Sequence, residues 1–211
     1  MIVDSVLKKL FSKRGMLFLM TRYGTSHTRQ LALDGYYESG QWDYFETTHS
    51  DTVIEQVKGY LTGGRLLDLG CGPGTVAARL NKDAFSYYLG VDASSHAIKR
   101  ARDRDIPNAH YQVSDFQHLD LADQVFDVIL LEESIYYLPS NHLGFLDGLT
   151  SHLTDNGVFI VTIADPDRYH GIVVGIRERY GLLHDAIMGN GRRLMMVFRQ
   201  DSEHAFKEIR Q

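Results

Sequence analysis

The sequence predicts an α/β protein with one domain and a mostly parallel β-sheet. From residue 65 onward, short apolar runs typical of buried strands alternate with segments whose apolar residues recur at helical spacing. A glycine-rich turn follows the first of these runs and leads into a helix. Such alternation is typical of strand–helix–strand units with right-handed crossovers. The chain has 211 residues, 44% apolar and 23% charged, which suits one domain with a full core.

The segment before this alternation is predicted to be helical and rich in aromatic residues. An amphipathic helix is expected from Val3, packed on the domain or on a second subunit, with attachment to a membrane surface as the alternative. A further helix is expected from about Thr52, since Thr52 and Glu55 have the spacing of a capping box. The Thr-Gly-Gly sequence at residues 62–64 ends it.

Five strands follow, separated by helices. The expected strands are 65–69, 87–91, 109–113, 126–131 and 158–163, and the expected helices are 75–81, 95–104, one that starts at Pro139, and 169–180. Residues 126–131 are apolar on both faces, as in a central parallel strand. Asn190 and Gly191 predict a hairpin turn, and the returning strand, 194–198, adds an antiparallel strand.

Charge and cysteine content narrow the function classes. The formal net charge is −5, whereas proteins that bind nucleic acid usually carry a basic surplus, so we expect no nucleic-acid partner. Cys71 is the single cysteine, which excludes an intramolecular disulfide and a cysteine-based zinc site and fits a cytoplasmic protein. The histidines form no metal-binding pair, so no metal is expected. No apolar run is long enough to span a bilayer, so we expect no membrane partner.

The strongest motif is LLDLGCGPGT, at residues 66–75. Its glycine-rich loop consists of Gly70, Cys71, Gly72, Pro73 and Gly74. Glycines let the backbone approach a ligand closely, and the start of the following helix offers free N–H groups. A dinucleotide fingerprint would place a third glycine at position 75, where this chain has threonine. Asp68, two residues before the first glycine, fits a cationic amine better than a pyrophosphate.

Two further acids follow the next strands. Asp92, with Ala93 after it, ends the second strand about 20 residues beyond the loop, where an acid hydrogen-bonds ribose hydroxyls. Asp115 follows the third strand and could accept from an adenine amine, while Phe116 covers a face of the ring. Each residue alone could be a cap, a turn residue or a core aromatic. Their order and spacing favour one ligand site.

Over roughly residues 50–165 these motifs resemble those of class I S-adenosylmethionine-dependent methyltransferases. The resemblance extends to FDVILLEESIYYL at 126–138 and LTDNGVFIVT at 153–162. It implies a Rossmann-like three-layer sandwich whose seven-stranded sheet has the order 3-2-1-4-5-7-6, with S-adenosylmethionine across the carboxyl ends of the strands. The expected cofactor contacts are Asp68, Gly70, Cys71, Gly72, Gly74, Asp92, Ala93, Asp115, Phe116 and Glu132.

The end of the fourth strand indicates where an acceptor binds. The stretch at residues 133–138 is similar to that of methyltransferases of the nodulation N-methyltransferase type. Glu133 could anchor a cationic amine or take the acceptor's proton, and the alternative is that it orients the next loop. One of Tyr136 and Tyr137 is expected to reach the site. We take Glu133 and Tyr136 as candidate catalytic residues. Carboxylates near the acceptor favour methylation of N or O of a small molecule such as an amine or a sugar.

The N-terminal segment is the expected lid. Residues 34–45 carry several aromatic side chains that could enclose the cofactor and its acceptor. The alternative is that Trp42 and Phe45 only pin the segment to the domain. We therefore divide the chain into a lid, 1–48, and a cofactor-binding domain, 49–211, and leave open whether it forms a homodimer.

Two other functions compete with methyl transfer. One is a nicotinamide-dependent oxidoreductase, against which Thr75 and the position of Asp68 both argue. The other is a protein that binds S-adenosylmethionine without turnover, since cofactor motifs alone do not certify an acceptor site. Amino-directed DNA methylation would require an Asn/Asp-Pro-Pro-Tyr/Phe motif where residues 132–135 read Glu-Glu-Ser-Ile.

Overall fold

The computed structural model describes residues 20, 23–42, 51–81, 83–138, 141–189 and 191–200. The helix expected from Val3, the lid residue Phe45, and the turn residues Pro139 and Asn190 lie outside this part of the chain.

The elements alternate along the chain as the apolar pattern predicts. The helices are α3 (Ser26–Glu38), α4 (Asp51–Leu61), α5 (Thr75–Arg79), α6 (Ser95–Arg102), α7 (His142–Leu149) and α8 (His170–Arg179). The strands are β1 (Arg65–Leu69), β2 (Tyr87–Asp92), β3 (Ala109–Val113), β4 (Phe126–Glu132), β5 (Leu153–Ala164), β6 (Tyr180–Met188) and β7 (Arg193–Gln200).

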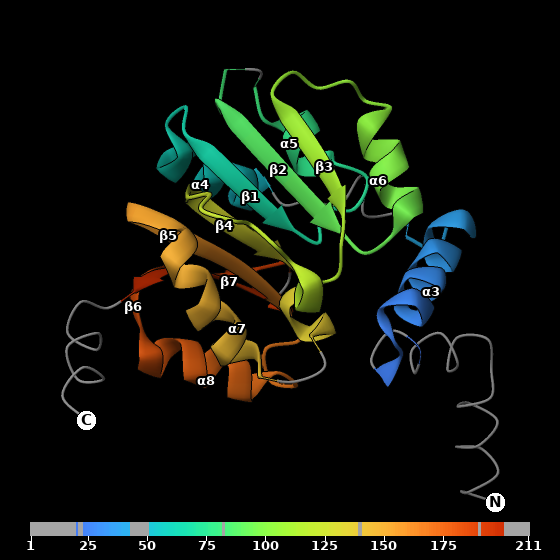
Figure 1. The fold of residues 1–211 in the computed structure, drawn as a ribbon. Helices are drawn as coiled ribbons and strands as arrows, with labels where there is room; N and C mark the ends of the chain where they lie inside the picture. Colours follow the sequence, from blue (N-terminus) through green and yellow to red (C-terminus); the bar gives the residue numbers. More distant parts are fainter. Residues whose placement is uncertain are drawn as a thin grey trace, which may run out of the picture.

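The strands form one seven-stranded sheet in the order β3-β2-β1-β4-β5-β7-β6. Strands β1 to β5 pair in parallel, and β7 runs antiparallel to both β5 and β6. Helices lie on both faces of this sheet (Figure 1). The predicted three-layer fold with one antiparallel strand is therefore confirmed.

The core has two parts because successive side chains of a strand point to opposite faces of the sheet. Leu66 on β1 and Val128 on β4 pack with apolar residues of α4, α5 and α6. Their neighbours Leu67 and Ile129 pack with α7 and α8 on the other face. All four side chains are fully buried, and each contributes about 1.5–3 kcal/mol to stability. The unbroken apolar runs of these strands are thus explained by burial on both faces.

Most boundaries differ from the predicted ones by a few residues, as three examples show. Strand β5 begins at Leu153 rather than Val158, because Leu153 pairs with Phe126 before an irregularity in the ladder. Helix α5 ends early, at Arg79, where the backbone turns to an extended conformation. Helix α4 begins at Asp51, so Thr52 lies inside the first turn rather than before it.

Strand β6 is implied by the predicted hairpin and by the seven-stranded sheet of the resemblance, but no residue range was predicted for it. It is the edge strand next to β7, and most of its central side chains are exposed. An edge strand needs little apolar alternation, so residues 180–188 carry a weak strand pattern. The turn at Gly191 and the returning strand β7 agree with the predicted hairpin.

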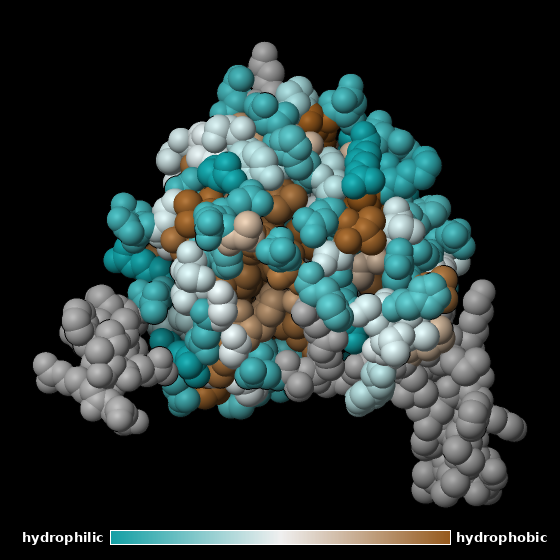
Figure 2. All heavy atoms as spheres, in the orientation of Figure 1, coloured by the Kyte–Doolittle hydropathy of each residue, from teal (hydrophilic) through white to brown (hydrophobic). Residues whose placement is uncertain are grey.

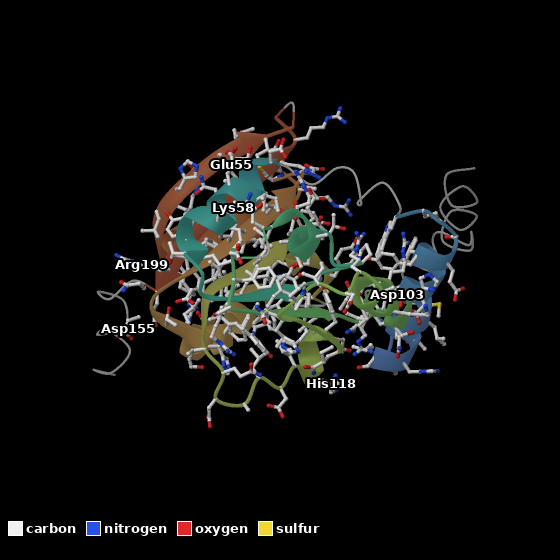
Figure 3. The ribbon with its side chains drawn as sticks, turned by 90° about the horizontal axis from the view of Figure 1, so that it is seen from above. Glu55, Lys58, Asp103, His118, Asp155 and Arg199 are labelled. Atoms are coloured by element: carbon white, nitrogen blue, oxygen red, sulfur yellow. The ribbon has the colours of Figure 1, made fainter. Side chains whose placement is uncertain are left out.

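Helix α3 lies beside α6, beyond the carboxyl ends of β2 and β3 (Figure 1). In the view from above, Asp103 at the end of α6 is on the same side of the molecule as α3, and Glu55 and Lys58 of α4 are on the other side (Figure 3). Asp34 of α3 holds the two helices together. Its carboxylate accepts from the amide of His96 at 3.0 Å and from the hydroxyl of Ser94 at the start of α6.

The face of the molecule seen in Figure 1 is mainly hydrophilic, with hydrophobic residues gathered toward its middle (Figure 2). No helix in the described part of the chain has the length and apolar run that a membrane crossing needs.

Candidate active site

A cleft of about 1040 Å³, open solvent included, lies at the carboxyl ends of the central strands. Its walls contain every residue predicted to bind the cofactor except Gly74, and they contain Glu133 but not Tyr136. The other lining residues are Arg29, Leu33, Tyr37, Trp42, Pro73, Val76, Ser134, Tyr137, Leu138 and Arg193. Residues at or just after the ends of β1 to β4, from α3 and from β7 are thus brought to one cavity.

The glycine loop between β1 and α5 forms the floor of this cleft. Gly72 has φ +54°, in the left-handed region, and an added Cβ would lie 2.9 Å from the hydroxyl of Tyr37. Gly74 precedes α5 with φ +73°, and a Cβ there would lie 3.0 Å from that of Ala101 on α6. Gly72 therefore keeps the backbone bare toward the cleft, whereas Gly74 allows the loop to pack on a helix behind it.

Asp92, at the end of β2, connects the glycine loop to the segment that follows β2. Its Oδ2 accepts from the amide of Gly72 at 3.0 Å and its Oδ1 from the amide of Ser94 at 2.8 Å. Burial raises the pKa of Asp92 from 3.8 to about 6, the two backbone N–H groups oppose this rise, and nearby Asp34 adds to it. Asp92 thus holds the loop in place and presents a desolvated carboxylate to the cleft.

Asp68 is more deeply buried, with 1% of its surface exposed. Its Oδ2 accepts a 2.5 Å hydrogen bond from the hydroxyl of Tyr88 on β2. Burial raises the pKa of Tyr88 well above its usual value, and the charge of Asp68 raises it further, so Tyr88 remains a hydrogen-bond donor at neutral pH. The carboxylate of Asp68 is oriented by a strand neighbour.

Asp115 lies at the start of the turn Phe116–His118, after β3. Its Oδ2 pairs with Nη1 of Arg29 at 3.1 Å, and its Oδ1 contacts Nδ1 of His118 at 2.8 Å. Burial raises its pKa, but hydrogen bonds with Ser26 and His118 and the charge of Arg29 outweigh this effect and lower the pKa overall. The ring of Phe116 stacks against Phe145 at 5.5 Å on the same side of the cleft.

Helix α3 contributes residues that the sequence analysis missed. Arg29, Leu33 and Tyr37 lie four residues apart on one helix face, and all three line the cleft. Arg29 is 7% exposed and donates both to Asp115 and to the carbonyl of Gly24 at 3.2 Å. The spacing of these residues was a detectable signal, but within the expected lid, 1–48, the stretch singled out to enclose the ligands was 34–45, which begins after Arg29 and Leu33.

An aromatic group closes the cleft on this side. Trp42 stacks on Tyr36 at 4.8 Å and meets Tyr37 edge-on at 5.1 Å. It also meets Tyr137, which follows β4, at 6.1 Å. Because Trp42 and Tyr137 are 95 positions apart in sequence, this contact links the N-terminal segment to the wall formed by β4.

Glu133 occupies a strained position at the end of β4. Its φ is +51°, which is uncommon for a residue other than glycine, and its amide donates to Oγ1 of Thr162 at 2.9 Å. Its Oε1 lies 2.5 Å from Nε of Arg193, the first residue of β7, and its Oε2 accepts from Tyr136 at 3.4 Å. Backbone strain of this kind clusters at functional sites.

The two tyrosines after Glu133 have different environments. Tyr136 packs against the core, where its ring stacks on Tyr169 at 4.6 Å, and burial followed by the charge of Glu133 raises its pKa strongly. Tyr137 is 39% exposed and lines the cleft. The tyrosine that reaches the cleft is therefore Tyr137, and Tyr136 lies behind Glu133.

The described residues contain no cluster of three or more His, Cys, Asp or Glu side chains that could hold a metal ion. The charged and aromatic groups that line the cleft are its carboxylates, Arg29, Arg193 and its aromatic side chains.

Comparison with known proteins shows a methyltransferase domain match over residues 49–208. The chain is 29% identical over 139 residues to trans-aconitate 2-methyltransferase of Escherichia coli (strain 55989 / EAEC), which covers 56% of this chain and 54% of the relative. It is 30% identical over 124 residues to the mitochondrial arginine-hydroxylase NDUFAF5 of Rattus norvegicus, which covers 58% of this chain and 36% of the relative. The match thus spans about a third to a half of these relatives' length.

Solved structures share the fold. The N-methyltransferase NodS from Bradyrhizobium japonicum WM9 matches with a TM-score of 0.59 at 18% identity, over 72% of this chain and 94% of its own. A TehB-like methyltransferase from Corynebacterium glutamicum ATCC 13032 matches with a TM-score of 0.62 at 18% identity, over 81% of this chain and 100% of its own. The chain therefore belongs to the methyltransferase domain family, the class I S-adenosylmethionine-dependent methyltransferases, whose usual methyl donor is S-adenosylmethionine.

Proposed function

We propose that this chain transfers the methyl group of S-adenosylmethionine to a nitrogen or oxygen atom of a small-molecule acceptor. The observation that carries the proposal is the single cleft, in which Asp68, Asp92 and Asp115 follow one another at the ends of three adjacent strands. Glu133 lines the same cleft from the next strand in the sheet, β4.

The acids of the cleft fit the donor groups of this cofactor. S-adenosylmethionine presents an ammonium group, two ribose hydroxyls and an adenine amine, and when bound it supplies an electrophilic methyl group on sulfur. We assign the ammonium to Asp68, the hydroxyls to Asp92 and the adenine to Asp115 and Phe116. Each carboxylate oxygen has more than one lone pair, so contacts already made by Asp92 and Asp115 leave room for further donors.

The acceptor half of the cleft lies beyond the glycine loop. Trp42 and Tyr137 cover it and exclude water, and their ring faces favour a positive charge. Glu133 orients the acceptor, and Tyr136 positions Glu133 through its hydroxyl. Catalysis then depends mainly on holding the acceptor's lone pair in line with the methyl group, since well-oriented reactants can gain about 7–11 kcal/mol.

The N-terminal residues act as a lid over the cofactor. We keep the division into a lid, 1–48, and a catalytic domain, 49–211. Arg29 and Tyr37 support this role, because α3 reaches Asp115 on the adenine side and Gly72 on the loop. Asp34 fastens the same helix to α6.

The relatives leave the chemistry at the acceptor open. One is named for methyl transfer to trans-aconitate and another for arginine hydroxylation. A cofactor-binding protein without methyl transfer is therefore the second candidate function. Turnover, rather than binding, separates the two.

Two measurements test the proposal. Calorimetric titration of the full chain with S-adenosylhomocysteine and with NADH should show binding of the former alone, and Gly72→Val should abolish it. Turnover of S-adenosylmethionine with a library of amines, phenols, amino sugars and organic acids should then release S-adenosylhomocysteine. Binding of NADH alone would refute the cofactor assignment, and binding without turnover on any acceptor would favour the second candidate.

A further inference from the structure

The acceptor half of the cleft contains an arginine that the cofactor assignment does not use. Arg29 and Arg193 are the two cationic side chains in the described wall, and Arg29 is engaged by Asp115 and Gly24. Arg193 begins β7, opposite Ala164 at the end of β5. Its side chain is 22% exposed, so it is largely shielded from water while it faces the cavity.

Arg193 keeps donors available on one edge of its guanidinium. Its Nε lies 2.5 Å from Oε1 of Glu133. Neither Nη1 nor Nη2 donates a hydrogen bond to another described residue. A guanidinium carries five N–H donors in a planar fork, so these two nitrogens present parallel donors that a planar anion can accept.

Glu133 fixes the direction of this fork. The Glu133 backbone lies in the left-handed region, its amide donates to Oγ1 of Thr162, and its side chain is 12% exposed. Tyr136 holds the second carboxylate oxygen. A guanidinium anchored at Nε by a buried, oriented carboxylate loses little further entropy when a ligand binds its other edge.

We infer that Arg193 binds a carboxylate group of the acceptor, so that the substrate class is a small organic acid methylated at another nitrogen or oxygen atom or at a second carboxylate. This inference rests on the proposed function. A carboxylate matches the fork in shape and charge and would be held by two parallel hydrogen bonds. A cationic amine, by contrast, would have to displace Arg193 from Glu133 or bind beside a guanidinium.

The cofactor's own carboxylate is a poor occupant of this edge. Asp68 on β1 and Asp92 on β2 place the methionine and ribose parts on one side of the sheet. Strand β7 lies three strand spacings from β1 in the order β1-β4-β5-β7, which is roughly 14 Å. The acceptor therefore has better access to Arg193 than the cofactor has.

The test uses the full chain saturated with S-adenosylhomocysteine and titrated by calorimetry with matched pairs of probes. The pairs are benzoate and benzamide, succinate and succinamide, and 4-hydroxybenzoate and its methyl ester, with benzylamine as the cationic probe. We expect at least one carboxylate to bind with a Kd below about 10 mM, and its neutral partner to bind at least about tenfold more weakly.

Three variants assign the binding to Arg193. Arg193→Gln should weaken the carboxylate about 10- to 100-fold, and Arg193→Lys, which keeps the charge beside Glu133 but lacks the fork, should weaken it about tenfold. The matched control is Arg192→Gln, because Arg192 is the exposed neighbour in the turn. It should leave the affinity unchanged.

Separate outcomes test the inference and the function beneath it. Absence of any carboxylate binding, binding of benzylamine alone, or unchanged carboxylate affinity in Arg193→Lys would overturn the carboxylate site. If Arg193→Gln loses as much affinity for S-adenosylhomocysteine as for the carboxylate, Arg193 binds the cofactor instead. This result would also overturn the carboxylate site. Failure of the wild-type chain to bind S-adenosylhomocysteine would refute the proposed function itself.

Discussion

Asp92 gives the sharpest prediction, because its burial couples its ionisation both to folding and to cofactor binding. Burial raises its pKa from 3.8 to about 6, although the amides of Ser94 and Gly72 oppose the rise. A carboxyl group whose pKa rises on folding holds its proton more tightly in the folded protein. Its contribution to stability is therefore present below the unfolded pKa and is lost as the pH rises through the folded pKa.

The magnitude follows from the two pKa values. Between about pH 4.5 and pH 7.5, a change from 3.8 to about 6 removes about 2 kcal/mol from the free energy of unfolding. For a chain of this size that corresponds to about 4–8 °C in Tm. In Asp92→Asn this part of the pH dependence should disappear, so the difference in Tm between wild type and variant should change by that amount across the range.

Cofactor binding should respond in the opposite direction. An ionised Asp92 is the better acceptor for ribose hydroxyls, so the wild-type Kd for S-adenosylhomocysteine should rise as the pH falls below about 6. Asp92→Asn should weaken binding about 10- to 100-fold at pH 7 and remove this pH dependence, since charge-assisted hydrogen bonds contribute about 1.5–3 kcal/mol.

The assay is thermal unfolding at several pH values, with and without S-adenosylhomocysteine. Asp103→Asn is the matched control, because Asp103 is an exposed acid on α6 that pairs with Lys99 outside the cleft. If the Tm difference between Asp92→Asn and wild type stays constant from pH 4.5 to 7.5, burial does not perturb Asp92 as argued. If the variant binds S-adenosylhomocysteine like wild type, Asp92 is not the ribose acid.

Three further changes test other parts of the site. Gly72→Val places a branched side chain at φ +54° and against Tyr37, so calorimetry should show loss of S-adenosylhomocysteine binding. The control Gly59→Val, where no atom lies within 4 Å of the added Cβ, should bind normally. Normal binding by Gly72→Val would show that the loop does not bind the cofactor. Arg29→Met removes the cation that pairs with Oδ2 of Asp115 but keeps the hydrogen bonds of Asp115 with Ser26 and His118, so it should lower stability by about 1.5–3 kcal/mol in urea unfolding. A loss under about 1 kcal/mol, the usual value for an exposed ion pair, would refute the role of this contact. Glu133→Gln should keep the affinity for S-adenosylhomocysteine within about twofold but lower the affinity for the acceptor, which would appear as a raised KM. A fall of about 10²–10⁴-fold in kcat at unchanged KM would instead indicate that Glu133 is a general base.

Local sequence patterns were enough to predict the sheet and most of the residues that line the cleft at the ends of β1, β2 and β3. Strands β1 and β4 are buried on both faces, so nearly every residue in them is apolar. Such a run can be recognised as a strand from its own sequence, without knowledge of the strands that pair with it. The glycine loop is equally local, because a left-handed φ such as that of Gly72 favours glycine whatever lies around it. Asp68 and Asp92 then follow from their place at the ends of strands.

Local patterns do not report contacts between distant residues, and the tertiary structure decided these. Strand β6 pairs with β7 at the edge of the sheet, where exposure weakens the pattern that would reveal it. Tyr136 and Tyr137 are neighbours of the same type, and only the short turn after Glu133 decides which one faces the cleft.

The two arginines of the cleft show most clearly that local sequence patterns do not reveal contacts between distant residues. Arg29 meets Asp115 across 86 positions of sequence, and Arg193 meets Glu133 across 60. Neither arginine belongs to a motif, and a charged side chain in a sequence is most often solvated. Folding makes them part of the site because α3 docks on α6 and β7 inserts between β5 and β6. This arrangement brings each guanidinium to a largely buried carboxylate.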